Sequence, residues 1–272
     1  MKVRVNGLEF GYDRAGSGEP VLLVPGLATP RLSWVNQMPV LARHFDVTCF
    51  DNRGIGESEV PGDWWSMPEM VSDTLGIMDA VGYTNAHLVG VSMGGIISQA
   101  IAMQHPERVR SLTLISTYCG GPDRAFMDED VAARLFVDGE PAARIRAGAE
   151  ATFGRTYRER NPDLFEGFVA FALANPPRSL SVFSQLGGCA SWLAEDSSGE
   201  GLSSMRKPAL VLHGDADEMS PVRNAEMIAD RIPDAKLRVW ADAGHALIHE
   251  RSDEVNEAIL EHLLSVEARA LS

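Results

Sequence analysis

Cysteines and long apolar runs are both scarce in this chain. Only three of its 272 residues are cysteines, at positions 49, 119 and 189, and this wide spacing excludes a disulfide framework and a cysteine-based metal cluster. Cys49 belongs to the apolar run 47–50, so we expect it to be a small buried side chain. No apolar run is long enough to span a bilayer, and residues 1–5 lack the apolar stretch of a secretory signal. These absences predict a protein of the reducing cytoplasm.

Positive charge is also in short supply, because 24 lysines and arginines face 38 aspartates and glutamates, for a net charge of −14. This balance argues against nucleic acid and against an anionic membrane as partners. The sequence has no histidine and cysteine spacing typical of a metal site and no glycine loop of the kind that binds phosphates. We therefore expect no metal and no other cofactor.

What the sequence does contain is an alternation of short apolar runs and helical patterns. The opening residues alternate in polarity and predict a hairpin that turns near Asn6-Gly7. Helical patterns at 66–81, 224–231 and 253–268, and a further helix ending near 104, separate several of the apolar runs. Such alternation predicts the α/β class, with a mostly parallel central sheet flanked by helices and an antiparallel hairpin at one edge. The predicted parallel strands are 21–24, 47–50, 86–89, 111–115, 208–213 and 236–240.

The alternation stops between residues 119 and 204, where the pattern is helical and contains no clear strand. We therefore predict a core domain formed by residues 1–118 and 205–272 and a helical cap, or lid, at 119–204. Seven of the ten phenylalanines lie in this cap, although its 86 of 272 residues would account for about a third of them. Their rings either line an apolar pocket from above or pack the cap helices together and onto the core. They are Phe126, Phe136, Phe153, Phe165, Phe168, Phe171 and Phe183.

The segment Gly90-Val91-Ser92-Met93-Gly94 carries the strongest chemical signal. It follows the apolar run 86–89 and leads into an apolar helix, so it is typical of a sharp turn between a strand and a helix. Ser92 in such a turn has its hydroxyl exposed above the sheet, and the flanking glycines let the strand and helix cross closely. A serine hydroxyl is a weak nucleophile unless a base takes its proton, and this context predicts Ser92 as a nucleophile with a base nearby.

Seven histidines could supply that base. His245 lies in the segment 243–246, directly after the last predicted strand, which puts it at the same edge of the sheet as Ser92. His249 is its main competitor, and we favour His245 because a loop position at a strand end suits the turn geometry. His213 ends a strand, and we expect it to be structural and bonded to the neighbouring loop. The remaining four, His44, His87, His105 and His262, are expected at surface or capping positions.

An acid should hold the base in the correct tautomer. The segment 213–221 offers three carboxylates after a predicted strand. Asp215 is close to the strand end and could serve the turn itself, whereas Asp217 is better placed to reach over the sheet. We therefore favour Asp217, and the chain order Ser92, Asp217, His245 is the nucleophile, acid, base order of this geometry.

A tetrahedral intermediate at Ser92 would need two donors for its oxyanion. The backbone N–H of Met93, directly after the nucleophile, is one candidate. The second should come from the loop after the strand at 21–24, and Leu27 is the best candidate there because Pro25 has no N–H.

Four motifs in this order make the chain resemble the α/β-hydrolase fold family over nearly its whole length. They are Pro25-Gly26-Leu27, the segment 50–58, the turn around Ser92, and the segment 213–221 followed by Gly244-His245. The chain is most similar to capped serine hydrolases such as carboxylesterases and 3-oxoadipate enol-lactonase-like enzymes. The resemblance implies an α/β-hydrolase fold with an inserted helical cap, and it assigns the segment 51–58 to a structural turn.

The chain departs from many of these relatives in one motif and from some of them in its nucleophile. Many relatives carry His-Gly where this chain has Pro25-Gly26, which leaves the backbone donor intact but changes the support of its loop. Relatives that open epoxides or remove halogens use aspartate where this chain has Ser92. The resemblance therefore argues against both of those activities.

These observations predict a cofactor-free serine hydrolase whose partner is a small-molecule ester or lactone. The same residues could instead cleave carbon–carbon bonds, hydrolyse amides, or use peroxide in place of water, because pocket details decide the bond and the acceptor. The fold also serves small-molecule receptors with a vestigial triad, an alternative that rests on fold-level analogy. Whether the chain is a monomer or a homodimer stays open.

Overall fold

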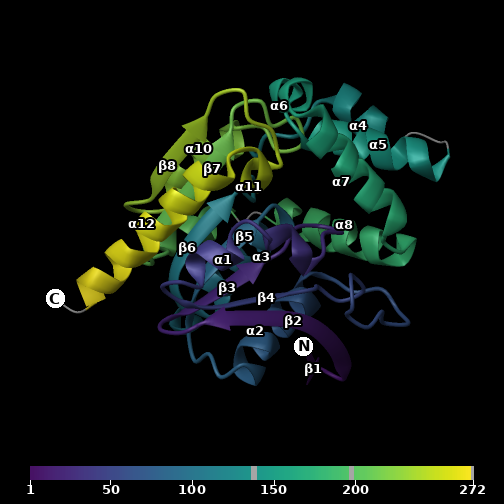
Figure 1. Ribbon diagram of the computed structural model, residues 1–272. Coiled ribbons are helices and arrows are strands. Elements are labelled where there is room, and N and C mark those ends of the chain that lie inside the picture. The colour runs from purple at the N-terminus through teal and green to yellow at the C-terminus, as the bar shows by residue number, and fades with distance from the viewer. Residues whose placement is uncertain (136–139, 196–198, 271–272) are drawn as a thin grey trace.

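The computed structural model describes residues 1–135, 140–195 and 199–270, which form an eight-stranded sheet covered by helices (Figure 1). The strand order is β1-β2-β4-β3-β5-β6-β7-β8. The pairs β1–β2 and β2–β4 are antiparallel and the others are parallel, so the predicted antiparallel hairpin does form one edge. The strands are β1 (Lys2–Val5), β2 (Leu8–Gly16), β3 (Pro20–Val24), β4 (Asp46–Phe50), β5 (Ala86–Val91), β6 (Val109–Ile115), β7 (Ala209–Gly214) and β8 (Lys236–Trp240).

Helices cover both faces of the sheet, and the alternation of side chains along the strands shows how. In β3, Leu22 and Val24 belong to one buried cluster, whereas Val21 and Leu23 belong to another on the opposite face. The first cluster is completed by α2 (Met67–Ala80), α3 (Met93–Gln104) and α10 (Arg223–Arg231). The second is completed by α1 (Met38–Leu41), α11 (Leu247–Glu250) and α12 (Ser252–Ala270). Cys49 lies in the second cluster and is buried, as predicted.

The segment between β6 and β7 is helical, as its pattern predicts. Figure 1 shows α4 to α7 gathered at one side of the molecule, with α8 beside them. The last of these helices packs directly on the core: an added Cβ at Gly188 would lie 2.9 Å from the Met70 side chain. The described helices here are α4 (Glu129–Leu135), α5 (Pro141–Thr152), α6 (Arg155–Arg160), α7 (Pro162–Ala174) and α8 (Ser179–Ala194).

The phenylalanines of this segment divide into two groups. Phe153 contacts the rings of Phe165 and Phe168 edge-on, with ring centroids 5.9 and 4.8 Å apart, so these three pack helices together. In contrast, Phe126, Phe171 and Phe183 are exposed on the surface. The packing explanation is therefore confirmed for the first group, and Phe136 lies outside the described residues.

Two histidines contradict the expectation of surface positions. His87 is fully buried on β5, where its ring nitrogens lie 2.7 Å from Ser111 Oγ and 3.0 Å from Glu267 Oε1. His262 on α12 is also buried. The expectation fails for His87 because β5 is a central strand with helices on both faces, so each of its side chains is buried whatever its polarity. His262 is buried because it lies on the side of α12 that faces the sheet.

Candidate active site

Ser92 sits in a strained turn between β5 and α3. Its backbone angles are φ +53° and ψ −119°, in the region that residues with a side chain rarely adopt. Neighbouring residues hold this turn, because the Ser92 N–H donates to the Ile115 carbonyl at 2.8 Å and the Thr117 hydroxyl donates to the Ser92 carbonyl at 2.7 Å. The side chain remains partly exposed, as the strand–turn–helix pattern predicts.

Two glycines permit the close crossing of strand and helix at this turn. A Cβ added at Gly90 would lie 2.3 Å from the Gly94 carbonyl oxygen, and one added at Gly94 would lie 2.0 Å from the Val24 carbonyl oxygen. Both separations are far below van der Waals contact, so any larger residue would push α3 away from the sheet. The predicted need for glycine at these positions is confirmed.

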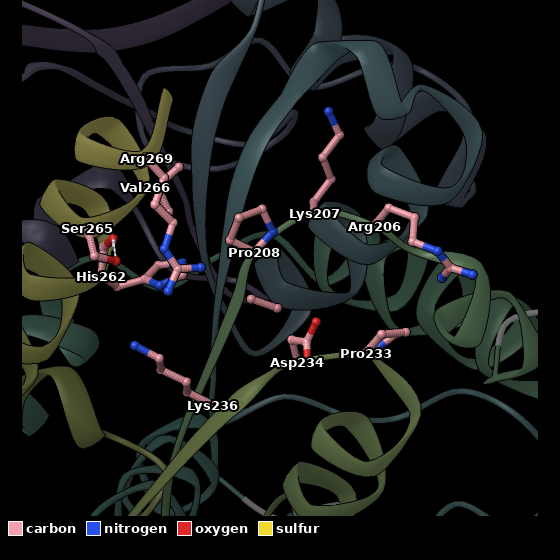
Figure 2. Close-up of a pocket in the computed structure, with 11 residues that line it drawn as sticks. Arg206, Lys207, Pro208, Pro233, Asp234, Lys236, His262, Ser265, Val266 and Arg269 are labelled. Carbon is pink, nitrogen blue, oxygen red and sulfur yellow. Dashed lines mark hydrogen bonds between the residues drawn. The ribbon is translucent and has the colours of Figure 1, made fainter. Parts of the chain in front are cut away.

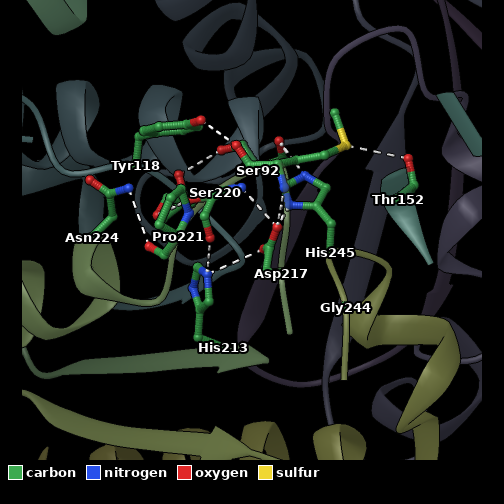
Figure 3. Close-up of polar contacts among 12 residues, drawn as sticks. Ser92, Tyr118, Thr152, His213, Asp217, Ser220, Pro221, Asn224, Gly244 and His245 are labelled. Atoms are coloured by element: carbon green, nitrogen blue, oxygen red, sulfur yellow. Dashed lines mark hydrogen bonds and ion pairs between the residues drawn. The ribbon is translucent and has the colours of Figure 1, made fainter. Parts of the chain in front are cut away.

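A chain of hydrogen bonds connects three of the predicted site residues across the carboxyl ends of the strands (Figure 3). His245 Nε2 lies 3.0 Å from Ser92 Oγ, and His245 Nδ1 lies 2.8 Å from Asp217 Oδ2. A carboxylate only accepts hydrogen bonds, so the proton of a neutral His245 is on Nδ1 and Nε2 is free to accept from the serine hydroxyl. Residues 92, 217 and 245 thus meet although the chain separates them by up to 153 positions.

Asp217 is buried, and hydrogen bonds from its neighbours compensate the negative charge of its carboxylate. Its Oδ1 accepts hydrogen bonds from the backbone N–H groups of Met219 at 2.9 Å and Ser220 at 2.8 Å. Burial alone would raise the pKa of this carboxyl, but the His245 and His213 rings beside it outweigh burial and lower the pKa to about 2. Asp217 is therefore ionised at neutral pH.

His213, near the end of β7, also contacts the Asp217 carboxylate. Its Nε2 lies 2.7 Å from the Ser220 carbonyl oxygen and 3.2 Å from Asp217 Oδ2. Both neighbours are acceptors, so Nε2 carries a proton. The predicted structural role of His213, bonded to the loop after β7, is confirmed.

Asp215, the alternative acid, and His249, the alternative base, both lie away from Ser92. Asp215 Oδ1 accepts from the Asp242 backbone N–H at 2.8 Å and so holds the turns that follow β7 and β8. His249 packs against the Phe153 ring at 6.3 Å, and burial lowers its pKa to about 4. Neither residue is within hydrogen-bond reach of Ser92 in the described part of the chain, whereas His245 is.

The predicted oxyanion donors lie on either side of Ser92, one at the start of α3 and one in the loop after β3. Met93 is the first residue of α3, where backbone N–H groups lack partners within the helix. The loop after β3 passes close to the serine, because a Cβ added at Gly26 would lie 3.5 Å from Ser92 Cβ. Within the described ranges, the N–H groups of Leu27 and Met93 donate to no protein acceptor. Both amides are therefore free to bind an anion.

Two residues that sequence reasoning missed hold the loops that carry Leu27 and His245 in place. The buried side chain of Gln185 on α8 accepts a hydrogen bond from the Ala28 N–H at 2.8 Å, next to Leu27. Glu250 Oε2 accepts from the Gly244 N–H at 3.0 Å, and its Oε1 accepts from the Gly154 N–H at 2.9 Å. Burial raises the pKa of Glu250. No local pattern marks either residue, because each partner is distant in the sequence or lies in an irregular loop.

The described residues contain neither a cluster of metal-binding side chains nor a helix that could span a membrane. Across residues 1–135, 140–195 and 199–270, no group of three or more histidine, cysteine, aspartate or glutamate side chains has the arrangement of a metal site. In the same residues, no helix has the length and apolar character needed to cross a bilayer.

Comparisons with known proteins agree with this geometry. A family model described as "alpha/beta hydrolase fold" matches residues 19–252. The poly(3-hydroxyalkanoate) depolymerase of Ectopseudomonas oleovorans is 30% identical over 233 residues, which cover 83% of this chain and 77% of that protein. The 2-hydroxymuconate semialdehyde hydrolase of Pseudomonas sp. (strain CF600) is 27% identical over 279 residues, covering 98% of this chain and 94% of that protein.

A solved structure extends the similarity to the fold. A thermophilic esterase from Thermogutta terrifontis superposes with a TM-score of 0.80 at 29% identity, covering 98% of this chain and 99% of that chain. The three proteins are named as a depolymerase, a hydrolase and an esterase, and these names imply different bonds and substrates.

Proposed function

The chain belongs to the α/β-hydrolase fold family, and from that premise we propose that it is a serine hydrolase that cleaves a carboxylic ester or lactone through an acyl-enzyme. The single observation that carries the proposal is the hydrogen-bonded chain from Ser92 through His245 to the ionised Asp217. A nucleophile, a base and an acid that orients the base are the three parts that this chemistry requires.

In this mechanism, Ser92 Oγ attacks the carbonyl carbon of the substrate while His245 Nε2 accepts the hydroxyl proton. Asp217 holds the ring through Nδ1 and stabilises the imidazolium that forms. The backbone N–H groups of Leu27 and Met93 bind the oxyanion, each contributing roughly 3–4 kcal/mol to the transition state. His245 then gives its proton to the leaving alcohol oxygen, and the acyl group remains on Ser92.

The second half of the reaction uses the same groups. His245 takes a proton from water, the resulting hydroxide attacks the acyl carbon, and the oxyanion forms again beside Leu27 and Met93. Proton return to Ser92 Oγ releases the acid. In the proposed organisation, residues 1–118 and 205–272 supply these groups, and residues 119–204 form a cap that shapes the substrate pocket.

Ester cleavage is proposed first because the three hydrogen-bonded groups and water are sufficient for it. The relatives support a range of chemistry: a depolymerase at 30% identity and an esterase at 29% stand beside a putative non-heme bromoperoxidase at 30%, a putative carbamate hydrolase at 28% and a 2-hydroxymuconate semialdehyde hydrolase at 27%. The choice among these bonds is therefore made by the turnover experiment described below. A receptor would need the same fold but no turnover, and the well-compensated Asp217 supports catalysis instead.

A labelling and turnover experiment tests the proposal. The purified protein would be treated with a fluorophosphonate probe, and its rates would be measured on p-nitrophenyl esters and lactones of graded length, an anilide and a 1,3-diketone. We expect labelling at Ser92 and fastest turnover of an ester or lactone, with both lost in a Ser92→Ala variant that keeps the wild-type circular dichroism spectrum. Labelling or turnover that survives in Ser92→Ala would contradict the mechanism, and preference for the diketone or anilide would contradict the substrate class.

A further inference from the structure

A short segment of the proposed cap, residues 152–154, lies against the loop that carries His245. The segment runs from the last residue of α5 to the residue before α6. The Ala246 N–H donates to the Thr152 carbonyl oxygen at 2.9 Å, so the residue directly after the histidine is bonded to this segment. Ala246 is also buried in one apolar cluster with Phe153, and the other buried members of that cluster come from α5 and α7. A residue of the histidine loop thus packs as part of the apolar core of the proposed cap.

The residue directly before the histidine is bonded to the same segment through a carboxylate. Glu250 Oε1 accepts from the Gly154 N–H at 2.9 Å, and Glu250 Oε2 accepts from the Gly244 N–H at 3.0 Å. The two backbones also approach each other closely, because a Cβ added at Gly154 would lie 2.9 Å from the Gly244 nitrogen. One added at Gly244 would lie 2.3 Å from the Gly154 nitrogen. Neither position has room for a side chain, so the segment and the loop are held in direct contact.

The ring of Phe153 contacts this loop at a third point. It stacks on the His249 ring with centroids 6.3 Å apart and an interplanar angle of 29°. Burial lowers the pKa of His249 to about 4, so its ring is neutral at pH 7 and packs as an uncharged surface. Phe153 is itself buried and contacts two phenylalanine rings of α7 edge-on. Helix α7 therefore supports the contact between Phe153 and the histidine loop.

The same segment reaches the loop that carries the acid. Thr152 Oγ1 lies 3.3 Å from the Met219 sulfur (Figure 3), and the Met219 N–H donates to Asp217 Oδ1 at 2.9 Å. Contacts from residues 152–154 thus extend to the loops of two of the three proposed catalytic residues. Ser92, in contrast, is held by hydrogen bonds to the end of β6 and to Thr117 in the core. The base and the nucleophile are therefore held by different parts of the molecule.

We propose that residues 152–154 are a positioning element for the catalytic base, because they hold the loop on both sides of His245 while its Nε2 meets the Ser92 hydroxyl. The inference rests on the serine hydrolase mechanism proposed above. It gives the proposed cap a second task besides shaping the pocket, since proton transfer from Ser92 requires the base and the nucleophile to keep their geometry. A displacement of about 1 Å can reduce a rate about 10²-fold, so a small shift of this segment is sufficient to lower kcat.

Gly154→Ala tests the inference by adding one methyl group. The backbone of Gly154 has φ −55° and ψ 142°, which alanine adopts without strain, so the variant acts through its close contact with the histidine loop. We expect kcat and the rate of fluorophosphonate labelling to fall together by about 10- to 100-fold, with KM changed by less than about twofold. Gly167→Ala is the matched control, because it lies on α7 and a Cβ there would meet nothing within 4 Å.

A measurement without substrate separates this inference from the proposed function. The proton between His245 Nδ1 and Asp217 Oδ2 should give a low-field resonance in proton NMR spectra recorded in water, and its position reports the geometry of that hydrogen bond. We expect the resonance to shift or broaden in Gly154→Ala and to stay at the wild-type position in Gly167→Ala. The spectrum can be recorded even if the wild type turns over no ester, so failure of ester cleavage and failure of the positioning role give different results.

The amino end of β8 supplies a control for disturbance of the strand itself. Lys236 begins β8 and lines a cavity of about 250 Å³ together with the basic residues Arg206 and Lys207 (Figure 2). This cationic cavity lies at the end of β8 opposite to the one that leads into the His245 loop. Lys236→Gln should therefore leave kcat, labelling and the resonance as in the wild type.

Phe153→Leu keeps the inference testable if Gly154→Ala does not fold. It retains an apolar side chain but removes the ring that stacks on His249, and it should lower kcat more than it raises KM. Circular dichroism spectra would establish that each variant is folded. A folded Gly154→Ala or Phe153→Leu with wild-type kcat and an unmoved resonance would overturn the proposal, as would a rise in KM alone. Equal losses in Gly167→Ala or Lys236→Gln would also overturn it.

Discussion

The carboxyl and amino ends of β7 and β8 differ in whether their charged side chains have partners in the protein. At the carboxyl ends, the buried Asp217 accepts two backbone hydrogen bonds and contacts two histidines. At the amino ends, Lys207 and Lys236 are partly or fully exposed and have no carboxylate beside them in the described part of the chain. The same pair of strands therefore carries one compensated anion at one end and two lysines without a neighbouring carboxylate, among the described residues, at the other.

The difference is explained by how a protein accommodates a buried charge and an exposed one. A buried charge is tolerated only when hydrogen bonds and opposite charges replace its water, and these partners also fix its orientation. Exposed cations keep their water and need no protein partner, so they can exchange that water for a ligand. A side chain held in one orientation suits catalysis, whereas an exposed cation without a protein partner suits the binding of an anion.

The largest expected effect comes from removing the charge at the compensated end. Asp217→Asn should reduce kcat by up to about 10⁴-fold, because an amide can hold His245 in the wrong tautomer and cannot stabilise its imidazolium. Asp215→Asn is the matched control, since Asp215 bonds to a backbone N–H in the adjacent turns, and steady-state kinetics on the best ester would compare the two. If Asp215→Asn proves the more damaging, the assignment of the acid is wrong.

A smaller effect should follow from loosening the loop that carries His245. Glu250→Gln leaves one acceptor oxygen for two backbone N–H groups, so either Gly244 or Gly154 loses its bond. We expect kcat and the rate of fluorophosphonate labelling to fall together, on the order of 10- to 100-fold, with little change in KM. Glu254→Gln, at an exposed position on α12, provides the control. A change confined to melting temperature would show that Glu250 has a purely structural role.

Asp217 also makes a pH-dependent contribution to stability. Its pKa falls from 3.8 to about 2 on folding, so the folded state favours the ionised form. The resulting stabilisation, on the order of 2 kcal/mol, is fully present above about pH 4 and is lost as the pH falls towards 2. Urea unfolding of the wild type and Asp217→Asn at several pH values should give a stability difference that grows between pH 2 and 4 and is constant above. A difference that does not change across this range would refute the depressed pKa.

The smallest effect is expected at the cationic end. The double variant Lys207→Gln, Lys236→Gln should change ester turnover by less than about twofold, because distant sites with no shared partner act independently. Steady-state kinetics on the best ester would check this. A larger loss of activity would mean that the two ends of the strands are coupled.

The sequence predicted the parts of the molecule that depend on local pattern. The positions of the strands along the chain, the turn around Ser92 and the candidates at 217 and 245 all follow from residues that are neighbours in the chain. The parts it missed depend on segments that meet only in the folded structure. Gln185 contacts Ala28 across 157 positions, and the cationic cavity gathers residues between 206 and 269 that form no charge run. His87 was misplaced because burial on a central strand depends on what covers it.

The bond between Gln185 and Ala28 limits how the molecule can admit a substrate. Helix α8 holds the backbone beside Leu27 through Gln185 and packs closely on α2 at Gly188. If α8 swung outward, the loop next to Ser92 would lose its anchor at the moment when a ligand arrives. We therefore expect a substrate to enter without displacing α8, so that an entering molecule finds the N–H groups of Leu27 and Met93 already in position.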